Sequence, residues 1–416
     1  MATDCFADLI EPFSRRGVDL GLGRLQSALA DLGHPERCFA AVQVAGTNGK
    51  GSISTLVHRS LLAAGIRAGL YTSPHLVSWT ERIRPGAEPI APEVLRRHLL
   101  TARASAETHG LTPFELVTAA AFLAFAEAGC PLVVLEVGLG GRLDATTCHP
   151  GREVIGFASV GLDHREFLGP DLASIAGEKA GVLQGGSVAV SGPQAPAVAA
   201  VLEAVAAAAG ADLRWRPPLA RQADGRLMIG DAWGECGLAG AVQAVNGAVA
   251  LGMLEALTER GWVIPMAAVR EGFAAARWPG RLQQLQRHGM PLLLDGAHNP
   301  PAAEALRREL AEQPDRHGLD PGPRCWVIGM LANKEGPAIL ETLLAPGDRA
   351  WIVPVPDHNC WSRATLVEAA PALAPQLMEA AELQAGIAAA HSAAGGRRVI
   401  VAGSLYLIGS LLAASE

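Results

Sequence analysis

The stretch AVQVAGTNGKGS, residues 41–52, decides the fold of this chain. Its first four residues have the apolar character of a buried strand, and Gly46 and Gly49 then form a turn that carries Lys50. A helix is predicted to follow over residues 51–64. A strand, a glycine-rich turn and a helix in this order are typical of a phosphate-binding loop, because free N–H groups at the helix start face phosphate oxygens.

The loop differs from the common phosphate-loop pattern in two places. Only Thr47 and Asn48 separate the two glycines, and Gly51 stands between Lys50 and Ser52. We expect Lys50 near β- and γ-phosphates and the Ser52 hydroxyl on a magnesium ion. From this pattern alone, an ordinary glycine-rich turn of an α/β domain is the alternative. The predicted nucleotide-binding residues here are Gly46, Thr47, Asn48, Gly49, Lys50, Gly51 and Ser52.

Composition limits the class of protein. The chain has 416 residues, of which 50% are hydrophobic and 18% charged, and its net charge is −7. This length predicts two domains, and the absence of a Lys/Arg block argues against a nucleic-acid surface. The seven cysteines include no C-x-x-C pair and are typical of isolated thiols in a reducing compartment. We therefore expect a cytoplasmic protein, a monomer, with no nucleic-acid or membrane partner.

Short apolar runs alternate with segments of helical length along the whole chain. Continuous apolar runs indicate strands covered on both faces, as in a parallel sheet between helices. Strands are predicted over residues 41–45, 68–71, 132–137, 154–160, 187–191, 292–295, 325–329, 350–353 and 399–402, and a helix over 195–209. The apolar segment 399–414 is divided by Gly403 and Ser404 and is interpreted as a strand and a helix start rather than a membrane span.

The chain is expected to divide where Trp278, Pro279, Gly280 and Arg281 interrupt regular structure. We predict an α/β fold in which a domain with a parallel sheet and the phosphate-binding loop, residues 1–280, precedes a smaller C-terminal α/β domain, residues 281–416.

Several single residues have two interpretations when each is taken alone. Glu136 ends a predicted strand beside the loop, where a carboxylate either holds magnesium or caps a helix. A lone histidine such as His164 is more often a surface or core residue than a ligand. Lys179, taken alone, is a solvated helix lysine, and Asn246 is a helix-surface residue.

Several longer motifs follow one another along the chain. They are GTNGKGS (46–52), YTSPHLVSWTERIR (71–84), LEVGLGGRLDATT (135–147), GLDHREFLGP (161–170), GEKAGV (177–182) and LLLDGAHNP (292–300). In this order they resemble the folate branch of the Mur ligase superfamily, the folylpolyglutamate synthase/dihydrofolate synthase family, over residues 19–411. The resemblance implies a P-loop-containing, Mur-ligase-like ATPase domain over residues 1–280, which would bind ATP and pterin, and a C-terminal glutamate-ligase domain over residues 281–416.

The resemblance implies two magnesium ions and a set of nucleotide contacts. It implies that Lys50, His164 and Lys179 act in catalysis, with Lys179 carbamylated, and that the other nucleotide contacts lie in the Q-x-x-N, WPGR and DGAHNP motifs. The implied metal ligands are Ser52, Ser73, Glu136 and His164. The implied nucleotide contacts beyond the loop are Asn246, Arg281, Asp295 and His298.

Three further motifs resemble the segments that hold dihydropteroate in bifunctional enzymes of this family: DLGLGR, LTPFE and GGRLDA. Pro113 stands where an aromatic residue often occurs. The implied substrate residues are Asp19, Leu20, Gly21, Leu22, Thr112, Phe114, Glu115, Gly141, Arg142, Leu143, Asp144 and Ala145. Looser matches at Lys334, Arg363 and Ser404 are compatible with glutamate binding.

The activity implied by the resemblance is ATP-dependent amide ligation. L-Glutamate would be added to dihydropteroate, to tetrahydrofolate polyglutamates, or to both, through an acyl phosphate, and closure near Arg281 would assemble the site. No nucleophile motif such as G-x-S-x-G is present. Two alternatives remain: a Mur-type ligase acting on a UDP-sugar precursor, and a nucleotide-binding ATPase that ligates nothing.

Overall fold

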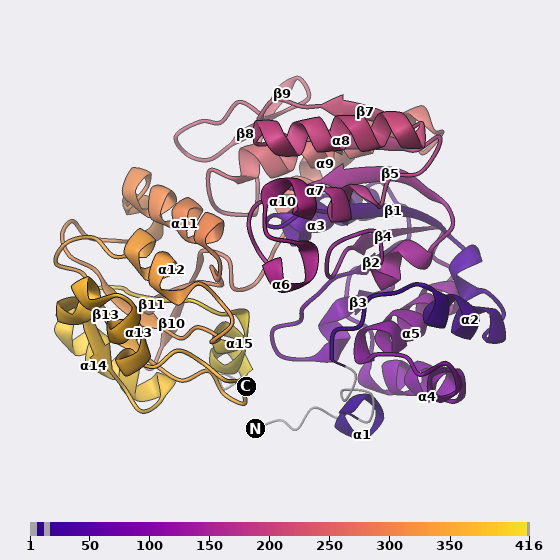
Figure 1. Ribbon diagram of the computed structural model, residues 1–416. Coiled ribbons are helices and arrows are strands. Elements are labelled where there is room, and N and C mark those ends of the chain that lie inside the picture. The colour runs from indigo at the N-terminus through magenta and orange to yellow at the C-terminus, as the bar shows by residue number, and fades with distance from the viewer. Residues whose placement is uncertain (1–5, 12–16, 414–416) are drawn as a thin grey trace. The chain divides into compact units, whose positions relative to one another are not determined.

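The computed structural model describes residues 6–11 and 17–413, which form two compact units (Figure 1). The larger unit takes residues up to 238 together with 242–278. The smaller unit takes 279–413 and the short segment 239–241. The chain thus passes from the larger unit to the smaller one after Trp278, within the W-P-G-R sequence.

A seven-stranded sheet forms the centre of the larger unit, in the order β3-β2-β4-β1-β5-β6-β7. All neighbours are parallel except β2 and β3. The strands are β1 (Ala40–Ala45), β2 (Ala68–Tyr71), β3 (Ile83–Arg84), β4 (Leu132–Glu136), β5 (Arg152–Phe157), β6 (Val188–Ser191) and β7 (Asp212–Trp215). Val44 of β1 is in register with Glu136 of β4 and Gly156 of β5, so the carboxyl ends of these three strands meet at one edge.

Helices cover both faces of this sheet. They are α1 (Ala7–Ile10), α2 (Gly23–Asp31), α3 (Lys50–Ala63), α4 (Pro92–His109), α5 (Pro113–Glu127), α6 (Arg165–Leu168), α7 (Leu172–Ala180), α8 (Pro196–Ala209), α9 (Gln243–Glu259) and α10 (Met266–Ala275). Because side chains alternate along a strand, Val42 and Val44 pack with α3, α9 and α10 on one face. Ala41 faces the layer of α4 and α5, and Ala45 the layer of α7 and α8. A two-stranded hairpin, β8 (Leu227–Ile229) with β9 (Ala232–Gly234), completes the unit.

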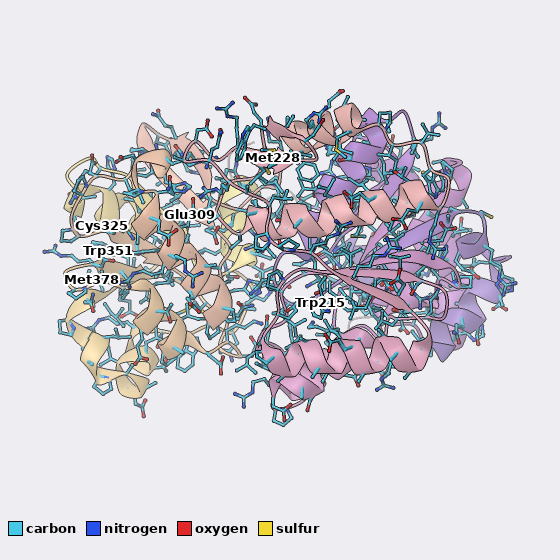
Figure 2. All side chains as sticks on the ribbon, turned by 90° about the horizontal axis from the view of Figure 1, so that it is seen from above. Trp215, Met228, Glu309, Cys325, Trp351 and Met378 are labelled. Carbon is cyan, nitrogen blue, oxygen red and sulfur yellow. The ribbon has the colours of Figure 1, made fainter. Side chains whose placement is uncertain are left out.

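The smaller unit contains a six-stranded sheet in the order β10-β11-β15-β12-β13-β14, parallel except for β10. Its strands are β10 (Gln283–Arg287), β11 (Met290–Asp295), β12 (Cys325–Ile328), β13 (Arg349–Ile352), β14 (Leu377–Glu379) and β15 (Val399–Ala402). Its helices are α11 (Pro300–Glu312), α12 (Gly336–Leu343), α13 (Arg363–Ala369), α14 (Leu383–Ala393) and α15 (Leu405–Ala413). Trp351 and Met378, which pair across β13 and β14, are visible in Figure 2.

The predicted α/β class is confirmed, and every strand predicted from an apolar run is present. The run 154–160 ends as a strand at Phe157, three residues early, because the following residues turn to meet the glycine-rich loop. The polar strand β10 was not predicted, since its sequence QQLQR lacks an apolar run and pairs only at the sheet edge.

Segment 399–413 forms strand β15 and helix α15, as expected from the break at Gly403 and Ser404. Among the residues that the structure describes, no helix is both long and apolar enough to cross a bilayer.

Candidate active site

The glycine-rich loop connects β1 to α3 and needs glycine at two positions. Gly46 has φ +140° and Gly49 has φ +101°, values that favour glycine. A Cβ atom on Gly46 would lie 2.7 Å from the Cβ of Ala158, and one on Gly49 would lie 2.5 Å from Oδ1 of Asn246. The loop is therefore packed closely between the end of β5 and helix α9.

Hydrogen bonds of backbone and hydroxyl groups fix the loop to the segment that follows β5. The N–H of Thr47 donates to the carbonyl of Ser159 (2.7 Å), and the Thr47 hydroxyl both donates to the Gly161 carbonyl and accepts from the Gly161 N–H (3.1 Å each). The Ser159 hydroxyl donates to the carbonyl of Asn48 (3.0 Å). This rigid turn leads directly into the first turn of α3.

Helix α3 begins without a side-chain cap at Gly49. The first N–H groups of an α-helix have no partner within the helix, and together with the helix dipole they favour an anion. The ammonium of Lys50 donates to the carbonyl of Thr47 (3.0 Å) and so lies over the loop. Ser52 is buried in the same turn. The arrangement can bind phosphate groups.

Trp278 explains why Gly51 interrupts the usual loop pattern. A Cβ atom on Gly51 would lie 2.4 Å from Cζ2 of the Trp278 indole, so the ring occupies the space that a side chain would need. The sequence indicates Trp278 only as part of a domain boundary. Its aromatic side chain in the WPGR sequence is the available signal, but no local pattern indicates where the ring packs.

Asn246 lies beside the loop, and its contact with a nucleotide stays a prediction. Its Oδ1 faces Gly49, and its Nδ2 donates to Oε1 of Gln243 at 3.0 Å. Both side chains are buried at the start of α9. The interpretation of Asn246 as a helix-surface residue is therefore wrong.

Glu136 and Ser73 meet at the edge of the sheet. Glu136 is the last residue of β4 and is only 4% exposed, and one of its carboxylate oxygens accepts the N–H of Ser73 at 3.4 Å. His164 directly precedes α6 with φ +50°, and its half-exposed ring lies 3.9 Å from the Asp163 carboxylate. The structure thus joins two of the four expected metal ligands by a direct hydrogen bond.

The expected metal ligands can hold magnesium only together with further oxygen atoms. Within residues 6–11 and 17–413, no group of three or more His, Cys, Asp or Glu side chains gathers as a metal site. Ser52, Ser73 and Glu136 offer oxygen atoms, which Mg²⁺ prefers, and Mg²⁺ is usually held by one or two carboxylates together with substrate phosphates. These residues therefore fit an ion shared with a nucleotide rather than a closed protein cage.

Lys179 is buried beneath the loop. Its side chain comes from the last turn of α7, is 5% exposed and donates from Nζ to the carbonyl of Gly46 at 2.8 Å. The interpretation as a solvated helix lysine is wrong. Burial is the main cause that lowers the pKa of Lys179 to about 7, and the charge of Lys50 lowers it further against the opposing charges of Asp163 and Asp144.

The loop after β4 carries the third predicted substrate segment and reaches Lys179. A Cβ atom on Gly141 would lie 2.7 Å from the Lys179 carbonyl oxygen, and Arg142 pairs with Glu178 at 2.8 Å. Leu143 is half-buried and Ala145 buried in the same loop. The predicted substrate segment and the buried lysine are therefore neighbours.

The carboxylate of Asp144 is directed at its own loop. It accepts the N–H groups of Gly138 (3.0 Å), Leu139 (2.9 Å) and Thr146 (3.0 Å), and the hydroxyl of Thr146 (2.5 Å). Burial raises the pKa of Asp144, and these hydrogen bonds oppose that shift. The Asp144 side chain thus shapes the loop, and its contact with a substrate stays a prediction.

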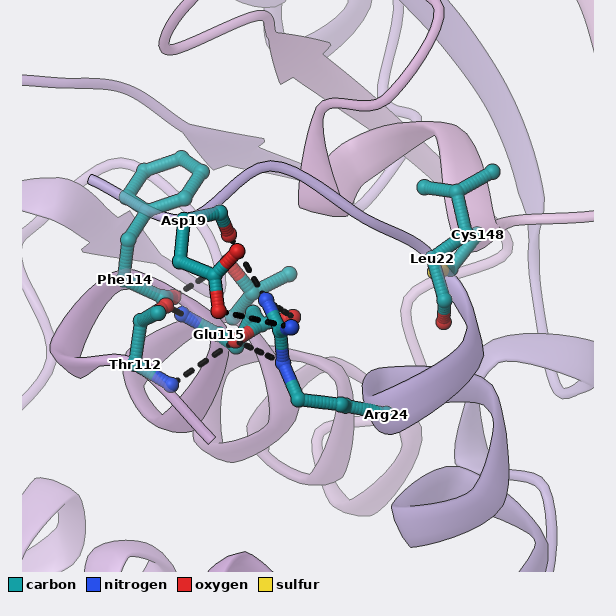
Figure 3. Close-up of polar contacts among 8 residues, drawn as sticks. Asp19, Leu22, Arg24, Thr112, Phe114, Glu115 and Cys148 are labelled. Carbon is teal, nitrogen blue, oxygen red and sulfur yellow. Dashed lines mark hydrogen bonds and ion pairs between the residues drawn. The ribbon is translucent and has the colours of Figure 1, made fainter. Parts of the chain in front are cut away.

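The other two predicted substrate segments lie together in the larger unit (Figure 3). Thr112 and Glu115 form a reciprocal capping box at the start of α5, and the Phe114 ring lies between Tyr71, at 6.0 Å between centroids, and Gly138. Leu20, Gly21 and Leu22 are half-buried and Asp19 is exposed. Pro113, the departure from the family pattern, occupies the first turn of α5, where proline is favourable.

In the smaller unit, the DGAHNP turn gathers the remaining predicted contacts. The Asp295 carboxylate accepts the N–H groups of Leu282 (3.0 Å) and Ala297 (2.9 Å) and lies 4.0 Å from the Arg281 guanidinium. Burial raises the pKa of Asp295, and Arg281 opposes this. His298 bonds through Nδ1 to the Gly296 carbonyl at 2.8 Å.

The looser glutamate candidates serve local structure. The buried Ser404 hydroxyl accepts the N–H of Tyr406 at 3.1 Å, Nε of Arg363 donates to the Leu377 carbonyl at 2.8 Å, and the Lys334 carbonyl accepts the Trp361 indole N–H at 2.9 Å. None of these contacts tests glutamate binding, so that role stays a prediction for each of the three residues.

An open helix start, a lysine over the loop and a carboxylate at the adjacent strand end define a P-loop enzyme that acts on a nucleotide. Comparison with known proteins narrows this class. Residues 280–414 match the family model for the C-terminal domain of dihydrofolate synthetase. A Mycobacterium tuberculosis dihydrofolate synthase/folylpolyglutamate synthase is 35% identical over 85% of this chain and 77% of its own length.

Solved structures agree with this match. Escherichia coli FolC in complex with DHPP and ADP superposes with a TM-score of 0.86 at 30% identity, covering 100% of this chain and 98% of that one. A bifunctional folylpolyglutamate synthase/dihydrofolate synthase with Mn, AMPPNP and L-glutamate bound gives a TM-score of 0.85 at 31% identity, with 100% and 99% covered. The chain belongs to the folylpolyglutamate synthase/dihydrofolate synthase family of ATP-dependent ligases.

Proposed function

We propose that this protein uses ATP to join L-glutamate to dihydropteroate, to tetrahydrofolate polyglutamates, or to both. The observation that carries the proposal is the buried Lys179 beneath an open phosphate-binding loop, in a chain whose family members ligate glutamate. A UDP-sugar substrate is disfavoured because the DLGLGR, LTPFE and GGRLDA segments are all present. An ATPase without ligation is disfavoured by the match across the smaller unit.

The proposed chemistry has two steps and needs no protein nucleophile. The substrate carboxylate attacks the γ-phosphorus of ATP, and ADP leaves to give an acyl phosphate. The amine of glutamate then attacks the acyl carbon, loses a proton and expels phosphate. The protein positions these groups and neutralises charge through the α3 N–H groups and the Lys50 ammonium.

We also propose two magnesium ions, held by Ser52, Ser73, Glu136 and His164 together with nucleotide phosphates. When bound, magnesium would supply positive charge at the phosphate groups. In support, the Ser73 N–H and the Glu136 carboxylate already meet at 3.4 Å beside the loop. A second site requires a further anion, since the described acidic and imidazole side chains form no cluster.

The further anion in this proposal is a carbamate on Lys179. The neutral amine attacks the carbon of CO₂, an N–C bond forms, and one proton is released. A pKa of about 7 supports the step, because an appreciable share of this buried amine is neutral at physiological pH. Incubation with ¹³C-bicarbonate should give one carbamate resonance that is missing from Lys179→Ala. Its absence from the parent protein would refute the carbamate.

We propose a cytoplasmic monomer that acts on small molecules, without nucleic-acid or membrane partners. A net charge of −7 and the reduced thiols of Cys38, Cys130, Cys148, Cys325 and Cys360 support this assignment. Sedimentation of the purified protein at several concentrations tests the oligomeric state.

A ligation assay with labelled glutamate tests the proposed function. Dihydropteroate and tetrahydrofolate are offered separately, and ADP and the labelled product are measured together. We expect one ADP per amide bond and little ADP when either glutamate or the pterin acid is omitted. Vigorous ATP hydrolysis without either substrate, and no labelled product, would refute the proposal.

A further inference from the structure

We propose that Arg24 is a positioning residue for the pterin part of the substrate. This inference rests on the proposed function. Arg24 lies in the first turn of α2, and its guanidinium faces two segments that are far apart in the sequence, the loop 19–22 and the start of α5 (Figure 3).

The guanidinium holds the loop through one residue, Asp19. Nη2 donates to the Asp19 backbone carbonyl at 2.7 Å, and Nη1 lies 2.8 Å from the Asp19 carboxylate. At the other end of the loop, the Cys148 thiol donates to the Leu22 carbonyl at 3.7 Å. The loop 19–22 is thus fixed at both ends, although Asp19 itself is exposed.

The same guanidinium reaches the carboxylate of Glu115, 91 positions later in the chain. Nε donates to Oε2 at 3.4 Å, and Nη2 lies 3.3 Å from Oε1, an ion-pair contact. The Glu115 side chain is 4% exposed and also accepts the Thr112 N–H at 2.7 Å. A buried carboxylate needs a paired cation, so Arg24 stabilises the helix start that carries Thr112 and Phe114.

A planar guanidinium can hold acceptors from two segments in one fixed geometry, which a lysine ammonium cannot. The polar contacts of the Arg24 guanidinium join residues of two predicted substrate segments, Asp19 and Glu115. We infer that Arg24 sets the separation of these segments. Its loss should therefore weaken binding of the pterin substrate and leave phosphoryl transfer unchanged.

The test compares Arg24→Lys and Arg24→Gln with the parent chain. Arg24→Gln should raise KM for the pterin substrate roughly tenfold or more, as expected for loss of a charged hydrogen bond. Arg24→Lys should recover part of this loss, and kcat and KM for ATP should stay within about twofold. Arg97→Gln is the matched control, since Arg97 forms an exposed bidentate pair with Glu127 at 2.7 Å in the same unit.

An unchanged pterin KM in both Arg24 variants would overturn the inference, as would a fall in kcat alone. If Arg24→Gln does not fold, the soluble Arg24→Lys variant still tests the inference through its pterin KM. Direct titration with dihydropteroate and with tetrahydrofolate separates this inference from the proposed function. If the parent binds either compound without ligating it, the function is refuted, and the ratio of Kd values in the parent and the Arg24 variants still tests Arg24. If the parent binds neither compound, both are refuted.

Discussion

The Nζ atom of Lys179 lies 2.8 Å from the carbonyl oxygen of Gly46, the first glycine of the phosphate-binding loop. The two residues are 133 positions apart in the sequence. The lysine is buried, and its hydrogen-bond partner in this contact is a backbone carbonyl rather than a carboxylate. Burying an ammonium is costly, so a lysine at such a place is a candidate for a function beyond packing.

Replacing Lys179 by alanine should abolish most of the ligase activity. The proposed carbamate would be lost with the side chain, and the vacated space beneath Gly46 would admit a small carboxylic acid. We expect added acetate or formate to restore part of kcat in Lys179→Ala and to have no effect on the parent. Ligation rates over a range of acetate concentrations provide the measurement.

Lys179→Met serves as the control for this rescue, because its side chain fills the space that acetate would occupy. Rescue of both variants by acetate would point to a general salt effect. Full activity of Lys179→Ala without any additive would show that the lysine has no catalytic part.

The pH dependence of stability should also report on Lys179. Its pKa is lowered from 10.5 to about 7 in the folded chain, so between these values the unfolded chain holds a proton that the folded chain has lost. Stability therefore rises with pH across this window, and the penalty of burying the ammonium is complete below about pH 7. Lys179→Met should be more stable than the parent near pH 7, by a margin that shrinks toward pH 10.

Urea unfolding at several pH values in carbonate-free buffer measures this margin. A constant difference between the two proteins from pH 7 to pH 10 would mean that the ammonium is not desolvated in the folded state.

Lys50→Ala should lower kcat by roughly a hundredfold or more, since removing one preorganised donor from a developing charge commonly has this effect. The hydrogen bond from the Lys50 ammonium to the Thr47 carbonyl is local to the loop, so its removal should leave the fold intact. Single-turnover kinetics together with circular dichroism provide the measurement. Near-normal turnover in a folded variant would contradict the assignment of the phosphate-binding loop.

Local patterns allowed much of the fold to be predicted from the sequence. Apolar runs indicate the central strands of both sheets. Such strands are buried on both faces, so their sequences are continuously apolar and can be recognised without knowledge of the tertiary structure. The polar strand β10 and the edge strand β7 lack that signal, since an edge strand meets solvent and its burial depends on what packs beside it.

Some features of the candidate site also follow from a local pattern, and others depend on the packing of distant segments. The conformation of Gly46 and Gly49 follows from a short sequence, and so does the turn at Asp295. The burial of Lys179 and the contact between Trp278 and Gly51 depend on segments far apart in the chain, which no local pattern specifies. The resemblance pointed to Lys179, but only the packing explains its lowered pKa.

Gly51→Ala should destabilise the larger unit and weaken ATP binding. The new Cβ would lie 2.4 Å from the Trp278 indole, and relieving that overlap must shift either the ring or the start of α3. Overpacking of this kind typically costs about 1–3 kcal/mol. Thermal unfolding and the KM for ATP provide the measurements.

Two further variants test this explanation. Gly177→Ala lies in helix α7, where the new methyl group would meet no described atom of a neighbouring segment within 4 Å, and it should be neutral or slightly stabilising. Trp278→Leu should make Gly51→Ala better tolerated than in the parent, a non-additive effect expected for residues in contact. Strict additivity of the two changes would show that the indole is not the obstacle.

Glu309→Ala should be among the most destabilising single changes in the smaller unit. Glu309 lies in α11 (Figure 2), is 3% exposed, accepts the Nε2–H of buried His317 at 2.9 Å and accepts the Ala241 N–H at 2.7 Å. Removing the carboxylate leaves the buried His317 imidazole and the Ala241 N–H without this acceptor, and breaking a buried pair commonly costs about 3–5 kcal/mol.

Glu304→Ala is the matched control in the same helix, because Glu304 forms an exposed i,i+4 pair with Arg308 at 2.8 Å. Such pairs contribute only about 0.3–0.5 kcal/mol. Glu309→Gln keeps an acceptor for Ala241 and should lose less stability than Glu309→Ala. Urea unfolding of the three variants ranks them, and equal losses for Glu304→Ala and Glu309→Ala would show that the buried pair contributes no more than a surface one.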